Sequence, residues 1–318
     1  MAGWRASDIP DQSGRTAVVT GANSGIGYFT ALELARRGAS VVLACRSAAR
    51  GRAAEVRLRT EVPGAKVEFM PLDLADLATV REFAAAYAQR HGTLDLLVNN
   101  AGVMALPFGR TADGFETQFG VNHLGHFALT GLLLPRLLAA APGARIVSLS
   151  SGFHMFGDVD HTDLDSERNY RRWIAYGRSK TANLLFVHEL ARRLAAAGSG
   201  IVAASAHPGY ASTNLHVAAA PQAGTTLGSR IAVAANSLGI AVGNGVIAQS
   251  AASGALPALY AATAPGVGPD EFIGPRFGFR GAPARSRRAK WTLDDKSGER
   301  LWAASEKLTG VSYASLSR

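Results

Sequence analysis

The sequence predicts an α/β protein with a doubly wound parallel sheet that is flanked by helices on both faces. Short apolar runs rich in β-branched residues alternate with longer helical segments, and short connections separate them. A glycine-rich turn at residues 21–27 joins the first run to the first helical segment. Neither a linker nor an internal repeat interrupts this order, so we expect residues 1–318 to form one domain.

The composition restricts the class of protein. Of the 318 residues, 47% are hydrophobic and 18% are charged, which is typical of a globular chain with a sizeable core. The single cysteine, Cys45, excludes an internal disulfide framework and a cysteine-based zinc site. A lone cysteine also fits a reducing compartment, and we expect a cytoplasmic protein without a metal ion.

Charge and the N-terminal segment bear on the partners. The formal net charge is +9, but no nucleic-acid-binding module accompanies it, so we expect no nucleic-acid partner. Residues 1–15 are polar and are broken by Pro10, so we expect no membrane anchor there.

The first half of the chain alternates strands and helices. The opening run, TAVVT, is short, apolar and β-branched, as in a strand buried on both faces. Such alternation predicts right-handed β-α-β units and hence parallel strands. We expect strands at residues 16–20, 40–44, 66–70 and 94–98, and helices from the glycine turn to about residue 37, at 48–61 and at 76–91.

A long apolar helix is predicted at residues 115–138. Such a helix is usually buried by the sheet on one side and often by a second subunit on the other, which suggests a homodimer or a homotetramer. After it we expect a strand at 145–149, an irregular charged segment at 152–172, a helix carrying Tyr176 to about residue 197, and a strand at 201–206.

The C-terminal part is predicted to be a substrate-covering elaboration of the sheet. Residues 231–269 carry no charged side chain, but polar residues and glycines interrupt them too often for a membrane span. We expect Gly243 and Gly245 to separate a covering portion from a packed helix that ends near residue 260. Residues 274–280 are predicted to be irregular, and residues 299–308 to form an amphipathic helix.

The glycine turn has the features of a dinucleotide site. It lies between a strand and a helix, where the helix N-terminus can hold a pyrophosphate. Glycine is needed there because a β-carbon would block the approach of the backbone to the phosphates. The spacing is G-x-x-x-G-x-G rather than G-x-G-x-x-G, and an ordinary strand-to-helix turn is the alternative.

The end of the second strand favours NADP(H) over NAD(H). An Asp or Glu at this place would hold the ribose hydroxyls of NAD, but Cys45 and Arg46 stand there instead. An arginine can pair bidentately with the 2′-phosphate of NADP. The alternative is a surface arginine, since Arg50 and Arg52 follow on the next helix.

Tyr176 and Lys180 form a candidate acid/base pair. One helical turn separates them, so they share a face of the helix. The pKa of a phenol is ordinarily about 10, and a neighbouring ammonium would lower it. The same pair is also typical of a solvated helix surface, so its meaning depends on the rest of the chain.

Several other motifs occur along the chain in a characteristic order. They are Thr20-Gly21-x-x-x-Gly25-Ile26-Gly27, Asp73-Leu74, Asn99-Asn100-Ala101-Gly102, Asn122, Ser151, Tyr176-x-x-x-Lys180 and Pro208-Gly209. Over nearly its full length, the chain resembles the short-chain dehydrogenase/reductase family, whose fold is Rossmann-type. The branch with the retinol dehydrogenases is the one it resembles more, through Ala44-Cys45-Arg46-Ser47 and Asn122-His123-Leu124-Gly125-His126-Phe127.

The resemblance implies an NADP(H)-dependent oxidoreductase that interconverts a carbonyl and an alcohol. It implies that Tyr176 gives or takes the proton and that Ser151 binds the carbonyl oxygen. Alignment of the strand favours Ser151 over Ser150. Lys180 would lower the pKa of the tyrosine and hold the nicotinamide ribose, and Asn122 would support the lysine through a water-linked proton path.

The resemblance also implies a set of cofactor-binding residues. Asn99 could instead join neighbouring strands, and Asp73 could instead cap the next helix. His154 and His207 lie near the site in the sequence, and we interpret them as structural or loop residues. The implied set is Gly21, Asn23, Ser24, Gly25, Ile26, Gly27, Arg46, Asp73, Leu74, Asn99, Ala101, Gly102, Tyr176, Lys180, Pro208, Gly209 and Thr213.

The substrate is expected to be a fairly apolar small molecule. Phe153, Phe156 and Trp173 and the uncharged stretch 231–269 favour this, although these residues could simply pack. The alternative function is a catalytically silent sensor or scaffold that binds NADP(H). The complete set of serine, tyrosine and lysine counts against that alternative, because a pure binder does not need all three.

Overall fold

The structure, a computed structural model, describes residues 3–210 and 249–316. Within them, one sheet of eight strands runs in the order β3-β2-β1-β4-β5-β6-β7-β8. Strands β1 to β7 pair in parallel, and β8 pairs with β7 antiparallel. The strands are β1 (Thr16–Thr20), β2 (Ser40–Cys45), β3 (Val67–Pro71), β4 (Leu96–Asn99), β5 (Arg145–Leu149), β6 (Val202–Ala206), β7 (Phe272–Pro275) and β8 (Pro283–Arg285).

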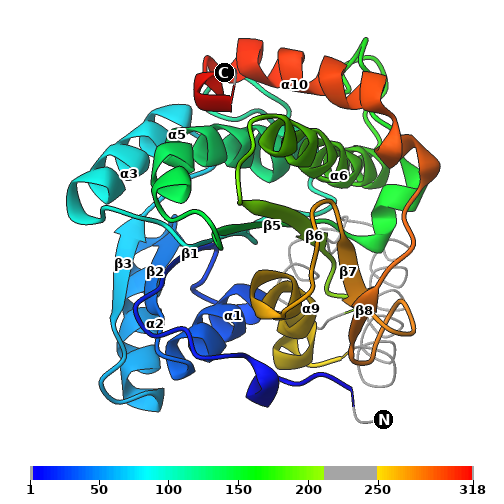
Figure 1. Cartoon of the computed structure of the whole chain (residues 1–318). Coiled ribbons are helices and arrows are strands. Elements are labelled where there is room, and N and C mark those ends of the chain that lie inside the picture. The colour runs from blue at the N-terminus through cyan, green and yellow to red at the C-terminus, as the bar shows by residue number, and fades with distance from the viewer. Residues whose placement is uncertain (1–2, 211–248, 317–318) are drawn as a thin grey trace, which may run out of the picture.

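Helices cover both faces of the sheet (Figure 1). One face carries α1, α2 and α9, the other carries α3, α5 and α6, and α10 lies outside α5 and α6. The predicted doubly wound parallel sheet is therefore confirmed. The helices are α1 (Gly25–Arg36), α2 (Ala48–Glu61), α3 (Leu77–Arg90), α5 (Gly125–Ala139), α6 (Arg172–Ala196), α9 (Ala251–Thr263) and α10 (Asp295–Thr309).

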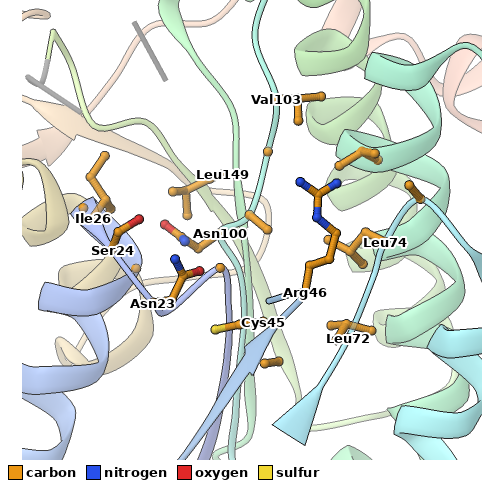
Figure 2. Close-up of a pocket in the computed structure, with 18 of the residues that line it drawn as sticks. Asn23, Ser24, Ile26, Cys45, Arg46, Leu72, Leu74, Asn100, Val103 and Leu149 are labelled. Atoms are coloured by element: carbon orange, nitrogen blue, oxygen red, sulfur yellow. The ribbon is translucent and has the colours of Figure 1, made fainter. Parts of the chain in front are cut away.

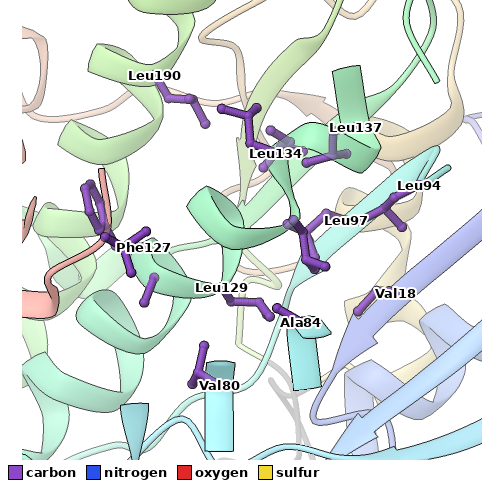
Figure 3. Packing of buried hydrophobic residues seen from close by; sticks show 14 of the residues in the cluster. Val18, Val80, Ala84, Leu94, Leu97, Phe127, Leu129, Leu134, Leu137 and Leu190 are labelled. Atoms are coloured by element: carbon purple, nitrogen blue, oxygen red, sulfur yellow. The ribbon is translucent and has the colours of Figure 1, made fainter. Parts of the chain in front are cut away.

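The two faces of the central strands bury different sets of side chains. Successive side chains on a strand point to opposite faces, so Val18 packs with α3, α5 and α6, whereas Val19 packs with α1 and α9. Figure 3 shows the first cluster, with Leu97 of β4 among Leu134 and Leu137 of α5. Burial on both faces fixes the strand register, because a shift by one residue would exchange the two sets.

Strands β1 to β6 lie within two residues of their predicted bounds. The prediction that residues 274–280 are irregular is wrong at its start, because β7 includes Gly274 and Pro275. The sequence also did not predict β8, which begins at Pro283. Proline cannot donate to a ladder, which weakens the strand signal in both segments. The edge of the sheet, where β7 and β8 lie, tolerates such residues.

The predicted helix at 115–138 contains a π-helical turn. The segment begins with α4 (Thr117–Phe119), continues through the π-helix η2 (Gly120–Leu124), and then becomes α5. Gly125 follows the turn, and a β-carbon there would stand 2.6 Å from the carbonyl oxygen of Leu74. The wide turn carries Asn122, and such turns are frequent at functional sites.

The outer face of α5 is covered by the C-terminal residues of the same chain. Trp302 of α10 is 2% exposed, and its ring centroid lies 5.1 Å from that of Phe127 and 5.9 Å from that of Phe186. Beyond α10, the hydroxyl of Tyr313 donates to the carbonyl of Phe127 at 2.7 Å. The face for which the sequence suggests a second subunit is therefore buried internally, and association there would require α10 to move.

Truncation of Trp302 tests how much this cover stabilises the protein. Trp302→Ala should lower the free energy of unfolding by about 3–5 kcal/mol, because it leaves a cavity between three helices. Leu308 lies on the same helix and is 36% exposed, so Leu308→Ala should change that free energy by less than about 0.5 kcal/mol. Urea denaturation measures both, and equal midpoints for the two variants would contradict the role of α10.

Candidate functional site

A cavity of about 500 Å³ lies at the carboxyl ends of the central strands (Figure 2). The chain turns to opposite sides of the sheet from β1 and β4, and such a switch point is where open α/β sheets bind ligands. The volume is typical of a small-molecule site. The predicted residues found in the wall are Gly21, Asn23, Ser24, Gly25, Ile26, Gly27, Arg46, Asp73, Leu74, Ala101, Gly102, Tyr176, Lys180 and Pro208.

The glycine turn is shaped for the close approach of a ligand. Gly21 and Gly25 have φ angles of 67° and 56°, in the left-handed region that favours glycine. A β-carbon on Gly27 would stand 2.5 Å from the carbonyl oxygen of Gly21, so a larger residue would displace the turn. The turn leads into the N-terminus of α1, whose N–H groups and positive dipole end suit a pyrophosphate. The cradle therefore fits a dinucleotide.

Two arginines line the cavity from the end of β2. Arg46 follows the strand, and Figure 2 shows its guanidinium inside the cavity. Arg50, in the first turn of α2, also lines the wall, although the sequence did not single it out as a cofactor-binding residue. With the hydroxyl of Ser47 beside them in the wall, they suit a phosphate monoester.

The segment after β3 contributes Asp73 and Leu74 to the wall. The alternative that Asp73 only caps the next helix is wrong. The N-cap of α3 is Asp76, whose carboxylate accepts a hydrogen bond from the N–H of Ala78 at 2.9 Å. The Asp73 carboxylate instead accepts from the N–H of Ala75 at 3.0 Å, which orders the turn between the strand and the cap.

Asn99 does not line the cavity, and its hydrogen bonds agree with the alternative that it joins neighbouring strands. Its side-chain nitrogen donates to the hydroxyls of Thr130 at 2.9 Å and Ser148 at 3.3 Å, which joins β4 to α5 and β5. Asn100 lines the wall instead, and its Nδ2 donates to the Thr20 carbonyl at 2.7 Å. Neighbouring residues on an extended backbone point to opposite sides, so of the adjacent Asn99 and Asn100 only one can face the cavity.

The loop after β6 enters the site only in part. Pro208 lines the cavity, whereas Gly209 does not. Gly209 has a φ of 66°, and a β-carbon there would stand 2.5 Å from the carbonyl oxygen of Phe279. Its glycine is therefore required by packing against the β7–β8 turn. Thr213 lies outside the described residues.

The described part of the C-terminal elaboration extends the sheet and covers helices. Among residues 249–316, none lines the cavity. Gly243 and Gly245, which the sequence places beside the covering portion, lie outside the described residues.

Tyr176 and Lys180 share a buried face of α6. The Lys180 ammonium lies 5.8 Å from the centre of the Tyr176 ring and donates to the Leu149 carbonyl at 3.2 Å. Burial raises the pKa of Tyr176 to about 12 and lowers the pKa of Lys180 to about 8, because each charged form would lose its hydration. The expectation that Lys180 holds the tyrosine pKa below its usual value is therefore wrong here. A hydrogen bond with Ser151 lowers that pKa in part.

The two serines after β5 have different partners. The hydroxyl of Ser150 donates to the Lys180 carbonyl at 2.9 Å and ties β5 to α6. The Ser151 side chain hydrogen-bonds with Tyr176 and accepts from the N–H of Phe153 at 3.3 Å, as the N-cap of a short 3₁₀ helix, η3 (Gly152–Phe156). This geometry pairs Ser151, rather than Ser150, with the tyrosine.

Asn122 joins three segments through its side chain. Its Oδ1 accepts from the N–H of Val103 at 2.8 Å, while Nδ2 donates to the Val103 carbonyl at 2.9 Å and to the Ser179 hydroxyl at 2.9 Å. These bonds fix α6 next to Lys180. The side chain is thus committed to these bonds, and the Asn122 carbonyl accepts from Nδ1 of His126 at 3.0 Å. The water-linked proton path to Lys180 stays a prediction.

Comparison with known proteins agrees with this geometry. A family model described as short chain dehydrogenase matches residues 15–224. The chain is 42% identical over 308 residues to retinol dehydrogenase 13 from Homo sapiens, which covers 95% of this chain and 87% of that protein. It is 50% identical over 196 residues to retinol dehydrogenase 12 from Mus musculus, and this match covers 62% of this chain and only 61% of that protein.

Solved structures share the fold. An uncharacterised protein from Mycobacterium paratuberculosis aligns with a TM-score of 0.79 and 43% identity over 98% of this chain and 99% of that chain. The RhlG/NADP complex from Pseudomonas aeruginosa aligns with a TM-score of 0.62 and 26% identity over 85% of this chain and 97% of that chain. On the family match and these identities, the chain belongs to the short-chain dehydrogenase/reductase family, in the branch of the retinol dehydrogenases.

Proposed function

We propose that the protein is an NADP(H)-dependent oxidoreductase that interconverts a carbonyl and an alcohol. One observation carries the proposal. The hydrogen bond between Tyr176 and Ser151 lies one helical turn from Lys180, beside a cavity whose glycine turn suits a dinucleotide. Bound NADPH would supply the hydride. The other parts of the reaction fall to the side chains of the protein.

Ser151 and Tyr176 act at the oxygen of the carbonyl. The Ser151 hydroxyl donates a hydrogen bond to this oxygen, where negative charge develops during reduction. The Tyr176 hydroxyl then gives its proton to the oxygen, and the alcohol is complete. With a pKa raised to about 12, Tyr176 is fully protonated at neutral pH and is ready to act as the acid. In oxidation, the phenolate takes the proton from the alcohol.

Lys180 supplies positive charge beside the tyrosine. Once Tyr176 has given up its proton, the ammonium 5.8 Å from the ring centre stabilises the phenolate. The same ammonium would donate to the hydroxyls of the nicotinamide ribose. Burial lowers the pKa of Lys180 to about 8, so most of it remains charged at neutral pH.

The preference for NADP(H) over NAD(H) rests on Arg46 and Arg50. Both line the cavity beyond the end of β2, where the adenosine ribose of a dinucleotide bound at the glycine turn would lie. Two guanidinium groups can pair with the two charges of a 2′-phosphate. The RhlG structure, which is named as an NADP complex, supports this choice.

A largely apolar substrate is supported by aromatic side chains next to the tyrosine. The ring centroid of Phe153 lies 5.7 Å from that of Tyr176, 5.1 Å from that of Trp173 and 5.7 Å from that of Phe156. Phe153 and its two aromatic neighbours are 36–68% exposed, so an apolar substrate would bury their free faces. The relatives named retinol dehydrogenases act, by that name, on an apolar alcohol.

Replacement of Tyr176 separates an enzyme from a silent binder. Tyr176→Phe should lower kcat for carbonyl reduction by about 10²–10⁴-fold, because it removes the hydroxyl that carries the transferable proton. Affinity for NADPH, measured by fluorescence titration, should change little since the ring remains. NADPH oxidation with a panel of aldehydes and ketones, retinal included, gives the rates. The same background rate for wild type and variant on every substrate would favour the sensor or scaffold.

Replacement of Arg46 tests the cofactor preference. Arg46→Asp should weaken NADPH binding by about 10- to 100-fold, because a charge-assisted hydrogen bond becomes a repulsion. NADH binding should be unchanged or tighter. Arg52→Asp is the matched control, since Arg52 lies six residues further along, on α2, over the Phe69 ring, and does not line the cavity. Equal affinities of the wild type for NADPH and NADH would refute the assignment.

The rates of alcohol oxidation and carbonyl reduction should change with pH in opposite directions. Alcohol oxidation should accelerate as pH rises from the acid side towards about 8, because the phenolate is the base and the pKa of Tyr176 is raised to about 12. Above about pH 8 the loss of the Lys180 proton opposes this rise. Carbonyl reduction should fall above about pH 8, where Lys180 loses its proton. Profiles of kcat/KM in both directions measure this. If Tyr176→Phe has the same rising limb in oxidation, another group is the base.

A further inference from the structure

Two buried histidines beside the site have no part in the chemistry proposed above. His154 lies on η3 and is 2% exposed, and His207 follows β6 and is 6% exposed. Both rings pack against Phe272 of β7, with centroids at 5.4 Å and 4.9 Å. Each therefore stands between the site and the C-terminal segment that begins with β7.

The hydrogen bonds of His154 determine which of its nitrogens carries the proton. The N–H of Ala289 points at Nε2 at 3.2 Å, and a peptide N–H can only donate, so Nε2 must be bare. The proton is therefore on Nδ1, which donates to the carbonyl of Ser151 at 2.6 Å. One neutral ring thus joins the backbone of the serine beside Tyr176 to the C-terminal segment.

His207 has the opposite tautomer for the same reason. The N–H of Gly209 donates to its Nδ1 at 3.2 Å, so the proton is on Nε2, which donates to the hydroxyl of Ser286 at 3.0 Å. The ring therefore joins the loop that carries Pro208, a residue of the cavity wall, to the same C-terminal segment. Gly274 on β7 leaves the room for this ring, because a β-carbon there would collide with it.

We propose that His154 and His207 are positioning residues that fix the active-site serine and the cofactor-side loop to the C-terminal segment 272–289. His154 sets the place of Ser151 through its carbonyl, and His207 sets the place of Pro208 through Gly209. Each ring makes both of its hydrogen bonds only in the tautomer given above, because moving the proton to the other nitrogen would break them. His154 therefore fixes the distance between the backbones of Ser151 and Ala289, and His207 fixes the distance between Gly209 and Ser286. The roles at the site rest on the function proposed above.

The surroundings keep both rings neutral. Burial lowers the pKa of His154, and burial lowers the pKa of His207 to about 4. The charged or titratable groups that face them are Arg288, which pairs with Asp270, and each other's ring. Asp270 also accepts from Nδ1 of His188 at 2.7 Å. Protonation would place a hydrogen against the N–H of Ala289 or Gly209, so the arrangement belongs to neutral pH and is lost in acid.

Two amide variants of His154 separate its two hydrogen bonds. The shorter His154→Asn can place an amide N–H where Nδ1 stands and keep the bond to Ser151, whereas His154→Gln can place an amide oxygen near Nε2 and keep only the bond from Ala289. We expect His154→Asn to retain kcat within a few-fold, and His154→Gln and His154→Phe to lose about 10- to 100-fold through misplacement of the serine. The KM for NADPH should not change in any of them.

Replacement of His207 should affect the binding of NADPH rather than kcat. His207→Gln keeps a donor for Ser286 and loses the acceptor for Gly209, so it should weaken NADPH binding with little change in kcat. His161→Asn is the control, since His161 lies in the same loop as His154 but bonds Ser297 of α10 at 2.8 Å. It should leave both constants unchanged. Circular dichroism and thermal melting identify any variant that fails to fold.

Nitrogen NMR of the wild-type imidazoles gives a readout that needs no activity. His154 should carry its proton on Nδ1 and His207 on Nε2, and both should titrate below the ordinary range of a histidine, because burial lowers the pKa of each. The reverse tautomers, or ordinary titration, would overturn the proposal even in an active enzyme. So would a His154→Asn variant that loses kcat while His154→Gln retains it. If the NMR agrees and no carbonyl substrate is turned over, the proposed function fails and the two tautomers still stand.

Discussion

The loss of water around Tyr176 and Lys180 is the constraint on which the rest of the site depends. Packing of α6 against β5 buries both side chains and moves both pKa values towards the neutral form. Charge that develops in such a place must be met by dipoles fixed in advance, because water is not there to reorganise. The Leu149 carbonyl and the Ser151 hydroxyl are such dipoles, and the Asn122 side chain holds the helix that faces them.

The sheet could be predicted where its strands are β-branched and buried on both faces, as in β1 and β2. The strands β7 and β8 could not, because Gly274, Pro275 and Pro283 carry no strand signal and pair only through tertiary contacts. The sequence also indicates that the helix carrying Phe127 is covered all round. The sequence does not indicate which element covers this helix, because an apolar stripe identifies the buried face of a helix and not the segment that packs against it.

Among the residues of the site, those that need an unusual backbone conformation could be predicted best from the sequence. Gly21 and Gly25 adopt angles that other residues rarely adopt, so their positions in the motif are informative. The choice between Asn99 and Asn100 could not be made from the sequence, because it depends on the direction in which each leaves the strand. The pKa of Tyr176 was equally hidden, since helical spacing indicates a nearby cation but not the hydration that burial removes.

The cover of α5 by Trp302 has a consequence for the protein while it is being synthesised. Helices α5 and α6 are complete about a hundred residues before α10 is made, which at usual rates of translation takes about 5–20 s. During that interval the apolar face that Trp302 and Tyr313 later close is open on the nascent chain. Chaperones that hold exposed apolar surface would find it there, and a premature stop codon anywhere before Trp302 would leave it open permanently.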